Sequence, residues 1–388
     1  MTKKPSYRLA GYTEPWERRK LGEISSRVKG NDGRMDLPTL TISAGQGWLD
    51  QRERFSGNIA GKEQKNYTLL RKGELSYNHG NSKLAKYGVV FQLNNYTEAL
   101  VPKVYHSFKM IDGRSGTFFE YLFATKIPDR ELGKLVSSGA RMDGLLNITY
   151  DDFMSIKLTF PKNNEEQTAI GSFFQDIDQL ISLQQRKLEV LKEQKKTYLK
   201  LLFPAKGQKK PALRFAGFED EWTSVLLGDI SELYQPKTVS SEELLTEGFP
   251  VFGANGYIGY YKDYNHKEDQ VTISARGEGT GTPSFVEGPV WITGNSMVVN
   301  VEKQANIIKP FLYAFCLSFD FKPFVTGGAQ PQLTREVLKK VNIMLPSLPE
   351  QQAIGSFFQD LDKAIAKQEE KVNQLKESKQ TLLRKMFI

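Results

Sequence analysis

The chain is 388 residues long, with 39% hydrophobic and 25% charged residues, a composition that supports two or three folded domains and excludes wholesale disorder. A single cysteine, Cys316, excludes an intrachain disulfide and a cysteine-based zinc site, and the three histidines have no ligand-like spacing. The start of the chain lacks the apolar stretch of a signal peptide, and the longest apolar run, residues 311–319, is too short to span a bilayer. A cytoplasmic protein with no structural metal and no membrane contact is therefore expected.

The net charge of +8 is unevenly distributed along the chain. Residues 1–165 carry +8, whereas residues 211–349 carry −5. Bulk charge alone therefore does not predict nucleic-acid binding for the second of these segments, although a basic stripe on a net-acidic domain remains compatible with it.

Short β-type runs, glycines and aromatic residues dominate the first large segment. The sequence predicts strands over residues 40–43 and 89–91, a helix over 117–125, a loop, and a last strand over 156–161 that ends in proline. The segment is therefore expected to be an α+β domain with exposed glycine-rich loops.

A long helix is expected next, over residues 166–203, and residues 350–387 repeat it with 21 of 38 positions identical. A second repeat relates residues 5–24 to residues 211–230, with eight of 20 positions identical. The two repeats together indicate that the chain arose by duplication and has two halves.

Apolar residues recur in both helices at alternating steps of four and three, which predicts a coiled-coil seam. Each helix also begins with a predicted capping box, Asn163 with Glu166 and Ser347 with Glu350. The two helices are expected to pack antiparallel on each other, and packing of each helix on its own domain is the alternative. The seam is interrupted by Lys195 and Lys379 and is otherwise expected to consist of Phe174, Ile177, Ile181, Gln184, Leu188, Leu191, Phe358, Leu361, Ile365, Gln368, Val372 and Leu375.

The second large segment has the same character as the first. Strands are predicted over residues 271–274, 290–293, 297–301 and 341–346, with a helix over 310–319. The expected order is a variable domain (1–165), a helix (166–203), a linker (204–210), a second variable domain (211–349) and a second helix (350–388). The fold class is α+β, with two antiparallel coiled-coil helices and a pseudo-two-fold internal repeat.

Motifs of catalysis are missing from the sequence. It contains no Walker A loop and no amino-methyltransferase motif, and the glycines between Gly277 and Gly281 lack the full dinucleotide-binding pattern. Cys316 lies in an apolar helical run and is expected in the core. No catalytic residue and no metal ligand is therefore assigned.

The halved organisation resembles the specificity subunit of type I restriction–modification systems, over essentially the whole chain. The resemblance rests on the segments from Trp16 to Ile24 and from Trp222 to Ile230, and on the helix start Leu345-Pro-x-Leu-Pro-Glu-Gln-Gln-Ala-Ile354. The first helix start departs from this pattern, because it lacks the second proline.

The resemblance implies a non-catalytic, DNA-binding role. Each variable domain would be a target-recognition domain that reads one half of an asymmetric, bipartite site on double-stranded DNA. The helix pair would set the spacer and dock two modification (methyltransferase) subunits. Restriction (ATP-dependent translocase and nuclease) subunits would complete the complex, and S-adenosylmethionine, ATP and Mg would be bound by these partners, with no cofactor in this chain.

Side-chain chemistry indicates the candidate DNA-binding residues, since Arg, Asn, Gln and Ser side chains pair with base edges or phosphates. Arg276 and Gln330 are the strongest, because both lie on loops that resemble those of the family. The alternative for each candidate is that it is a solvated loop residue without a role in DNA binding. The candidates are Ser43, Gln46, Asn78, His79, Lys83, Arg141 and Asp143 in the first domain, and Asn255, Tyr257, Ser274, Arg276, Gln330 and Gln332 in the second.

A rival hypothesis is a non-enzymatic coiled-coil scaffold whose variable domains bind protein or glycan. The matched helix starts and the missing signal peptide argue against it. A nuclease or methyltransferase is weaker still, because no motif supports either activity.

Overall fold

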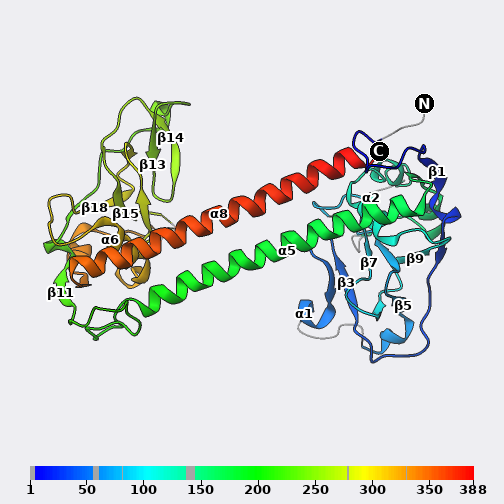
Figure 1. The fold of residues 1–388 in the computed structure, drawn as a ribbon, viewed down its shortest axis with the longest axis horizontal. Coiled ribbons are helices and arrows are strands. Elements are labelled where there is room, and N and C mark those ends of the chain that lie inside the picture. Colours follow the sequence, from blue (N-terminus) through cyan, green and yellow to red (C-terminus); the bar gives the residue numbers. More distant parts are fainter. Residues whose placement is uncertain (1–4, 56–60, 81, 137–144, 278, 329) are drawn as a thin grey trace. The chain divides into compact units, whose positions relative to one another are not determined.

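The computed structural model describes residues 5–55, 61–80, 82–136, 145–277, 279–328 and 330–388. The chain divides into two compact units. The first unit comprises residues 1–184 and 371–388, and the second comprises residues 185–370. Each unit contains one α+β domain together with parts of the two long helices (Figure 1).

The two long helices are α5 (Asn164–Leu201) and α8 (Leu348–Met386). In the first unit, Phe174 contacts Phe387 while Lys379 binds Asp178, so the residue numbers rise along one helix as they fall along the other. In the second unit, Tyr198 contacts Phe357 and Lys195 binds Asp362, in the same sense. The helices therefore run antiparallel within each unit, as expected, and both begin and end within about two residues of the expected bounds.

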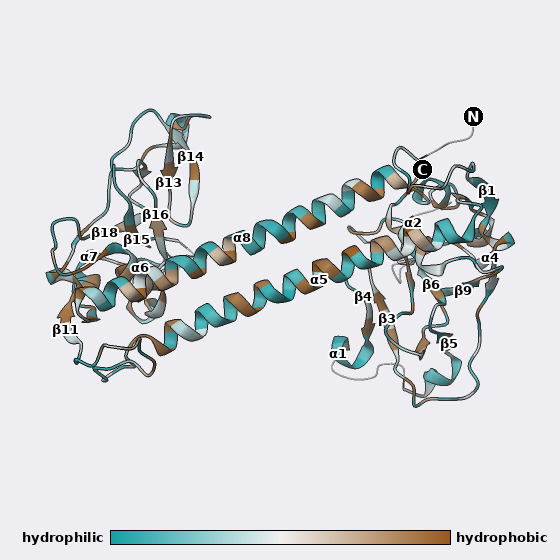
Figure 2. Cartoon of the chain, viewed as in Figure 1, coloured by the Kyte–Doolittle hydropathy of each residue, from teal (hydrophilic) through white to brown (hydrophobic). Residues whose placement is uncertain are grey.

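The seam follows the apolar pattern of the sequence. Figure 2 shows hydrophobic and hydrophilic residues alternating around α5 and α8. All twelve residues expected at the seam are buried or half-buried. The interrupting residues Lys195 and Lys379 are satisfied by ion pairs with Asp362 and Asp178.

The α+β domain of the first unit is built from several small antiparallel sheets. The largest has the strand order β2-β9-β6-β7, and three two-stranded sheets pair β1 with β10, β3 with β4 and β5 with β8. The strands are β1 (Glu17–Lys20), β2 (Ser25–Arg27), β3 (Leu40–Ser43), β4 (Gly47–Asp50), β5 (Thr68–Arg71), β6 (Leu75–Asn78), β7 (Val89–Gln92), β8 (Glu98–Val101), β9 (His106–Met110) and β10 (Lys157–Phe160), and the helices are α1 (Gln51–Phe55), α2 (Gly116–Ala124), α3 (Asp129–Leu132) and α4 (Tyr150–Ser155).

The domain of the second unit has a related plan with different sheets. Its four-stranded sheet has the order β12-β18-β15-β16, a three-stranded sheet has the order β14-β13-β17 with β13 and β17 parallel, and β11 pairs with β19. The strands are β11 (Thr223–Leu226), β12 (Glu232–Tyr234), β13 (Phe249–Phe252), β14 (Tyr257–Tyr261), β15 (Gln270–Ser274), β16 (Pro283–Val286), β17 (Trp291–Ile292), β18 (Ser296–Asn300) and β19 (Asn342–Leu345), and the helices are α6 (Lys309–Ser318) and α7 (Arg335–Leu338).

A tryptophan near the start of each domain receives the end of a long helix. In the first unit Trp16 lies edge-on to Phe118 of α2 and to Phe387, which follows α8. In the second unit, Trp222 contacts Phe311 of α6 and Phe203, which follows α5. The helix that follows one domain thus ends in the core of the other, by the same aromatic contact in both units.

The predicted capping boxes at the helix starts are wrong in one respect. Asn163 does cap α5, since its side chain accepts a hydrogen bond of 2.7 Å from the Glu165 amide. Glu166 does not reach back to the cap, because both of its carboxylate oxygens are held by Arg8 at 2.7 Å. Glu350 is held by Arg214 in the same way. A guanidinium that binds a carboxylate through two charge-assisted hydrogen bonds is a stronger partner than a single backbone amide.

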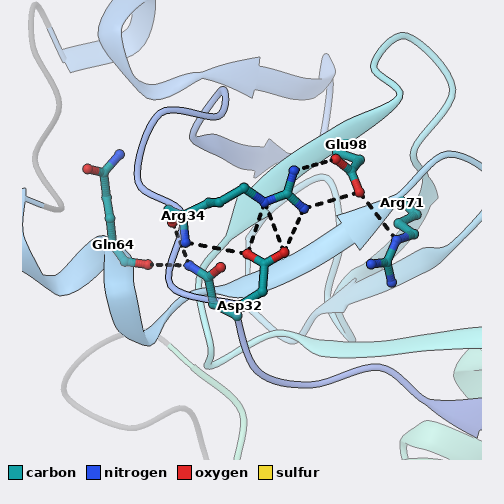
Figure 3. A network of polar contacts seen from close by, with 6 residues as sticks. Asp32, Arg34, Gln64, Arg71 and Glu98 are labelled. Carbon is teal, nitrogen blue, oxygen red and sulfur yellow. Dashed lines mark hydrogen bonds and ion pairs between the residues drawn. The ribbon is translucent and has the colours of Figure 1, made fainter.

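An ionic network fastens the segment that leads into β3 (Figure 3). Arg34 binds Asp32 on its own loop and Glu98 at the start of β8, and Glu98 also accepts a hydrogen bond from Arg71. Arg34 holds the pKa of the Glu98 carboxyl below its usual range. The network therefore ties the loop that precedes β3 to β5 and β8. The end of β3 in turn contributes to the candidate site.

Candidate nucleic-acid interface

In the first unit, the structure brings three of the predicted residues together around one hollow. Ser43 at the end of β3, Asn78 at the end of β6 and Lys83 in the following loop line a hollow of about 420 Å³. Arg54 and Leu84 also line it, and none of its lining residues is acidic. The hollow is therefore electropositive, and it offers hydrogen-bond donors beside apolar walls, as base edges and phosphates require.

The Asn78 side chain fixes the backbone on two sides of this hollow. Its side-chain amide donates to the Ile42 carbonyl oxygen at 3.2 Å, and its Oδ1 accepts from the Gly80 amide at 3.1 Å. The side chain thus ties β3 to the turn that follows β6. Lys83 and Gln46 are exposed, so these two candidates are free to face a ligand.

His79 is not at the surface, contrary to its selection as a DNA-contacting residue. Its side chain is buried, with Nδ1 at 2.8 Å from the Leu146 carbonyl oxygen and Nε2 at 3.0 Å from that of Val104. Its ring stacks on His106, and burial lowers the pKa of His106 to about 4. The histidine pair therefore positions the chain around Leu146.

Two further candidates of the first domain, Arg141 and Asp143, lie outside the described residues. Leu146, which the histidine pair holds, is close to them in the chain.

In the second unit, three loops that contain most of the candidates are joined to one another. The Leu333 amide donates to the Ala275 carbonyl oxygen at 3.0 Å, and Arg276 and Gln332 are partners in a β-bridge. Asn255 lies against Gly279, where an added Cβ would meet the Asn255 side-chain amide, so a larger residue at this position would displace that side chain.

Exposure separates the candidates of the second unit into two groups. Asn255, Arg276, Gln330 and Gln332 are exposed, and the Tyr257 side chain is 57% exposed. Ser274 is only 1% exposed, and its hydroxyl is buried in β15. The structure therefore contradicts the expectation that the Ser274 side chain is exposed at the interface, because β15 is covered on both faces of its sheet.

Sequence reasoning missed a chain of polar side chains centred on the buried His266 in the second unit. The Tyr234 hydroxyl bonds to His266 Nε2 at 2.8 Å, and His266 Nδ1 bonds to Asn265 Oδ1 at 2.7 Å. Asn265 in turn bonds both backbone groups of Ile292 in β17. Burial lowers the pKa of His266 below its usual range, which keeps the ring neutral and fits the single proton that this chain needs on Nδ1.

Arg54 was also missed by the sequence reasoning, because its helix is too short to show a period. The Arg8–Glu166 and Arg214–Glu350 pairs could have been found, since both partners of each pair recur at equivalent positions of the sequence repeats.

The described part of the chain contains no group of three metal-ligating His, Cys, Asp or Glu side chains. Within the same residues, no helix combines the length and the apolar character that crossing a membrane requires.

Comparisons with known proteins show which proteins this chain is similar to. Residues 219–377 match the family model described as the type I restriction modification DNA specificity domain. The chain is 24% identical over 155 residues to the EcoprrI specificity subunit of Escherichia coli, covering 39% of this chain and 38% of that protein. It is 23% identical over 282 residues to the MjaVIII specificity subunit of Methanocaldococcus jannaschii, covering 64% and 65%. The matches thus span less than two thirds of the length of these relatives.

The fold is similar to that of two solved structures. The S subunit of a type I restriction–modification system from M. genitalium superposes with a TM-score of 0.68 at 18% identity, over 100% of this chain and 99% of that one. A structure from work on complex assembly and conformational transition of the type I R-M system gives a TM-score of 0.54 at 17% identity, over 97% and 99%. The resemblance of this chain to the specificity subunits of type I restriction–modification systems is therefore confirmed, and residues 219–377 are the part that matches the model of the DNA specificity domain.

Proposed function

We propose that this chain is the DNA sequence-recognition subunit of a cytoplasmic type I restriction–modification complex. Each variable domain reads one half of an asymmetric, bipartite site on double-stranded DNA, and the helix pair sets the spacer between the halves. The chain itself carries out no catalysis.

The observation that carries the proposal is one repeated frame under two different domains. The Arg–Glu pair, the tryptophan contact and the interhelical lysine pair recur in both units with the same residue types. The sheets and exposed loops on this frame differ between the units. A repeated frame suits duplex DNA, whose strands are two-fold related, and divergent loops suit two different half-sites.

The reading residues in this proposal are the exposed candidates together with Arg54. Lys83 and Arg54 in the first unit and Arg276 in the second supply the cationic donors, which favour guanine edges and phosphates. Ser274, His79 and Asn78 act indirectly, by fixing the loops that carry the readers.

The partners in this proposal follow from the same repeat. Two modification subunits dock on the matching helices, one for each half, and restriction subunits bind the resulting complex. S-adenosylmethionine, ATP and Mg²⁺ chemistry belongs to these partners.

The proposal is tested by single-molecule methylome sequencing of a methylation-deficient cell that expresses this chain with its cognate modification subunit. The expected result is a new bipartite, asymmetric motif, methylated once on each strand and absent from a control strain without this chain. A stable complex that methylates no defined motif contradicts sequence recognition by this chain.

Exchange of residues 25–160 for the equivalent domain of another specificity subunit tests the modular reading in the same assay. One half of the motif is expected to change while the other half and the spacer persist. A change in both halves contradicts independent reading by the two domains.

A further inference from the structure

The first unit contains a second hollow, larger than the one at the candidate DNA interface. Its volume is about 610 Å³, and it lies between β1, β10 and the segment that includes α3. In Figure 1, β1 lies at the opposite end of the first unit from β3 and α1, which carry the candidate DNA residues. We call this hollow the basic cavity.

Positive charge dominates the rim of the basic cavity. Arg18, Arg130, Lys134 and Lys157 line it, with Glu131 as the one carboxylate among the lining side chains. Glu131 already binds Lys134 at 2.6 Å and Arg18 at 3.3 Å. Among the described residues, Arg130 and Lys157 have no ion-pair partner. The rim therefore retains unneutralised positive charge.

The floor of the basic cavity is apolar. Leu122 and Leu158 are buried beneath it, and Ile127 is 38% exposed beside Pro128. A concave site of this volume, with an apolar floor and a few charged groups at the rim, has the build of a ligand pocket.

The second unit has no equivalent of this charge. In the first unit, Arg18 stands opposite Thr159 and Lys20 opposite Lys157 across the β1–β10 pair, which places three cations on one face. At the matching register of β11 and β19, Ser224 stands opposite Met344 and Leu226 opposite Asn342. Neither of those strands contains a charged residue.

The segment that follows α6 in the second unit is also less charged around its aromatic residues than the segment that follows α2 in the first unit. After α6, the ring of Phe319 contacts those of Phe321 and Phe324 in the second unit. The corresponding segment after α2 in the first unit contains α3, with its charged side chains. The basic cavity is therefore a feature of one half, whereas the helix surfaces are repeated.

From this geometry we propose that the basic cavity binds an acidic peptide segment of a partner protein, anchored by an apolar side chain, once per chain. Carboxylates of the peptide pair with Arg130 and Lys157, and the apolar side chain covers Ile127 and Pro128. Duplex DNA fits the site less well, because its phosphates lie on a convex rod that does not reach an apolar floor. The site lies outside the DNA-reading surface, so its occupant differs from the target of the proposed function.

The test uses the full chain and a fluorescein-labelled peptide of four glutamates around a central Leu-Phe pair, with fluorescence anisotropy at physiological salt. One peptide is expected to bind per chain. Replacing the glutamates by glutamines, or the Leu-Phe pair by two serines, is expected to weaken binding roughly tenfold each, since both the charges and the apolar anchor contribute.

Charge reversal at the site supplies the matched variants. The double substitution Arg130→Glu with Lys157→Glu is expected to lower peptide affinity by roughly tenfold or more, whereas Lys322→Glu with Lys340→Glu in the second unit leaves it unchanged. Arg130→Ala with Lys157→Ala is the second variant, and circular dichroism confirms that each variant is folded.

Three results would overturn the inference: no peptide binding, binding that is insensitive to the Arg130 and Lys157 variants, or displacement of the peptide by random-sequence duplex DNA through the same residues. The last result identifies a phosphate-binding surface instead. Methylation of the target motif is measured separately on the same variants, so failure of the peptide site and failure of DNA recognition are distinguishable.

Discussion

Single buried carboxylates at the starts of α5 and α8 hold each domain to its helix. The Glu166 side chain is 1% exposed and the Arg8 side chain 14% exposed, and Glu350 with Arg214 has the same values. Each pair joins the segment that precedes a domain to the helix that follows it. A buried carboxylate has lost its hydration, so the free energy of the folded state depends on the groups that bind it, of which, among the described residues, the guanidinium is the one counter-charge.

Loss of this partner is expected to be costly. Arg8→Ala should lower the free energy of unfolding by about 3 kcal/mol, because it leaves Glu166 buried without its counter-charge. Urea unfolding followed by circular dichroism measures the loss. Arg18→Ala is the matched control, since Arg18 is 57% exposed in its pair with Glu131 and should contribute about 1 kcal/mol or less. Equal losses for the two variants would contradict a structural role for the buried pair.

Glu120 on α2, unlike Glu166, lies in surroundings that disfavour its charged form. Burial raises the pKa of its carboxyl from 4.5 to about 7, and the neighbouring Asp178 carboxylate adds to the rise. The folded state therefore binds this proton more tightly than the unfolded state. Its contribution to stability is fully present below the unfolded pKa and is lost as the pH rises through the range from about 4.5 to about 7.

Glu120→Gln should remove this pH dependence, because glutamine stays neutral. The variant is expected to be more stable than the parent by on the order of 1–2 kcal/mol at pH 8, and equal to it at pH 4. Thermal unfolding at the two pH values measures the difference. The control is Glu23→Gln, at a surface ion pair with Arg19, which should show little change. A gain of the same size at both pH values would mean that titration of Glu120 is not its cause.

At the scale of elements, local periodicity in the sequence predicted the individual strands and helices, whose formation depends on neighbouring residues. The strand expected over residues 40–43 is β3, and the helices expected over 117–125 and 310–319 are α2 and α6, displaced by one residue. The parallel pairing of β13 with β17 was not predictable, because it joins residues about 40 positions apart and depends on packing. Local periodicity did not indicate the partner of Glu166 either, since Arg8 is 158 positions away, although the recurrence of both residues in the two repeats could have indicated it.

The candidate site was predicted to a lesser degree than the fold. Residue type and loop position identified Arg276, Gln330 and Lys83, all of which are exposed. They could not reveal that Ser274 is buried, because β15 is covered on both faces and lacks the alternation of a half-exposed strand. Nor could they show that the Asn78 side chain is hydrogen-bonded to the backbone of Ile42 and Gly80.

The interhelical lysine pairs show why the seam tolerates charge. Lys379 contacts both oxygens of Asp178, which also accepts a hydrogen bond of 2.7 Å from Tyr121, and this contact fixes α8 against α5 and α2. In the second unit, Lys195 pairs with Asp362 at the equivalent positions. Because shifting one helix along the other breaks these contacts, the polar residues specify the register.

A double-mutant cycle is expected to reveal the coupling between Asp178 and Lys379. Asp178→Asn and Lys379→Met together should cost about 1 kcal/mol less than the sum of the single substitutions, a modest value because the Asp178 side chain is 41% exposed. Urea unfolding of the four proteins gives the coupling. Lys363 with Asp360, both 79% exposed on one helix, provides the reference cycle, for which coupling should be close to zero. Additive effects at Asp178 and Lys379 would contradict a role of this pair in the seam.

At the scale of the whole molecule, the two ends of the described chain meet as if a linker joined them. The Tyr7 amide donates to the Lys385 carbonyl oxygen at 3.0 Å, within the first unit. The Leu213 amide donates to the Leu201 carbonyl oxygen at 2.9 Å in the second unit, where residues 202–212 connect the same two positions of the repeat. The frame around each domain is therefore the same whether or not the chain is continuous there.

A circular permutant tests this equivalence. The chain is opened between Gly207 and Gln208, which are exposed in the linker, and residue 388 is joined to residue 5 through a copy of residues 205–210. The permutant should retain its helix content and lie within about 1 kcal/mol of the parent in stability, because only linker contacts change. Circular dichroism and urea unfolding measure both quantities, and methylome sequencing should return the same motif as the parent. The control permutant is opened between Thr272 and Ile273, where both residues are buried in β15, and should fail to fold. If the linker permutant also fails, continuity of the chain between the two halves matters in a way that the repeated contacts do not explain, and the two units cannot be treated as equivalent holders of interchangeable domains.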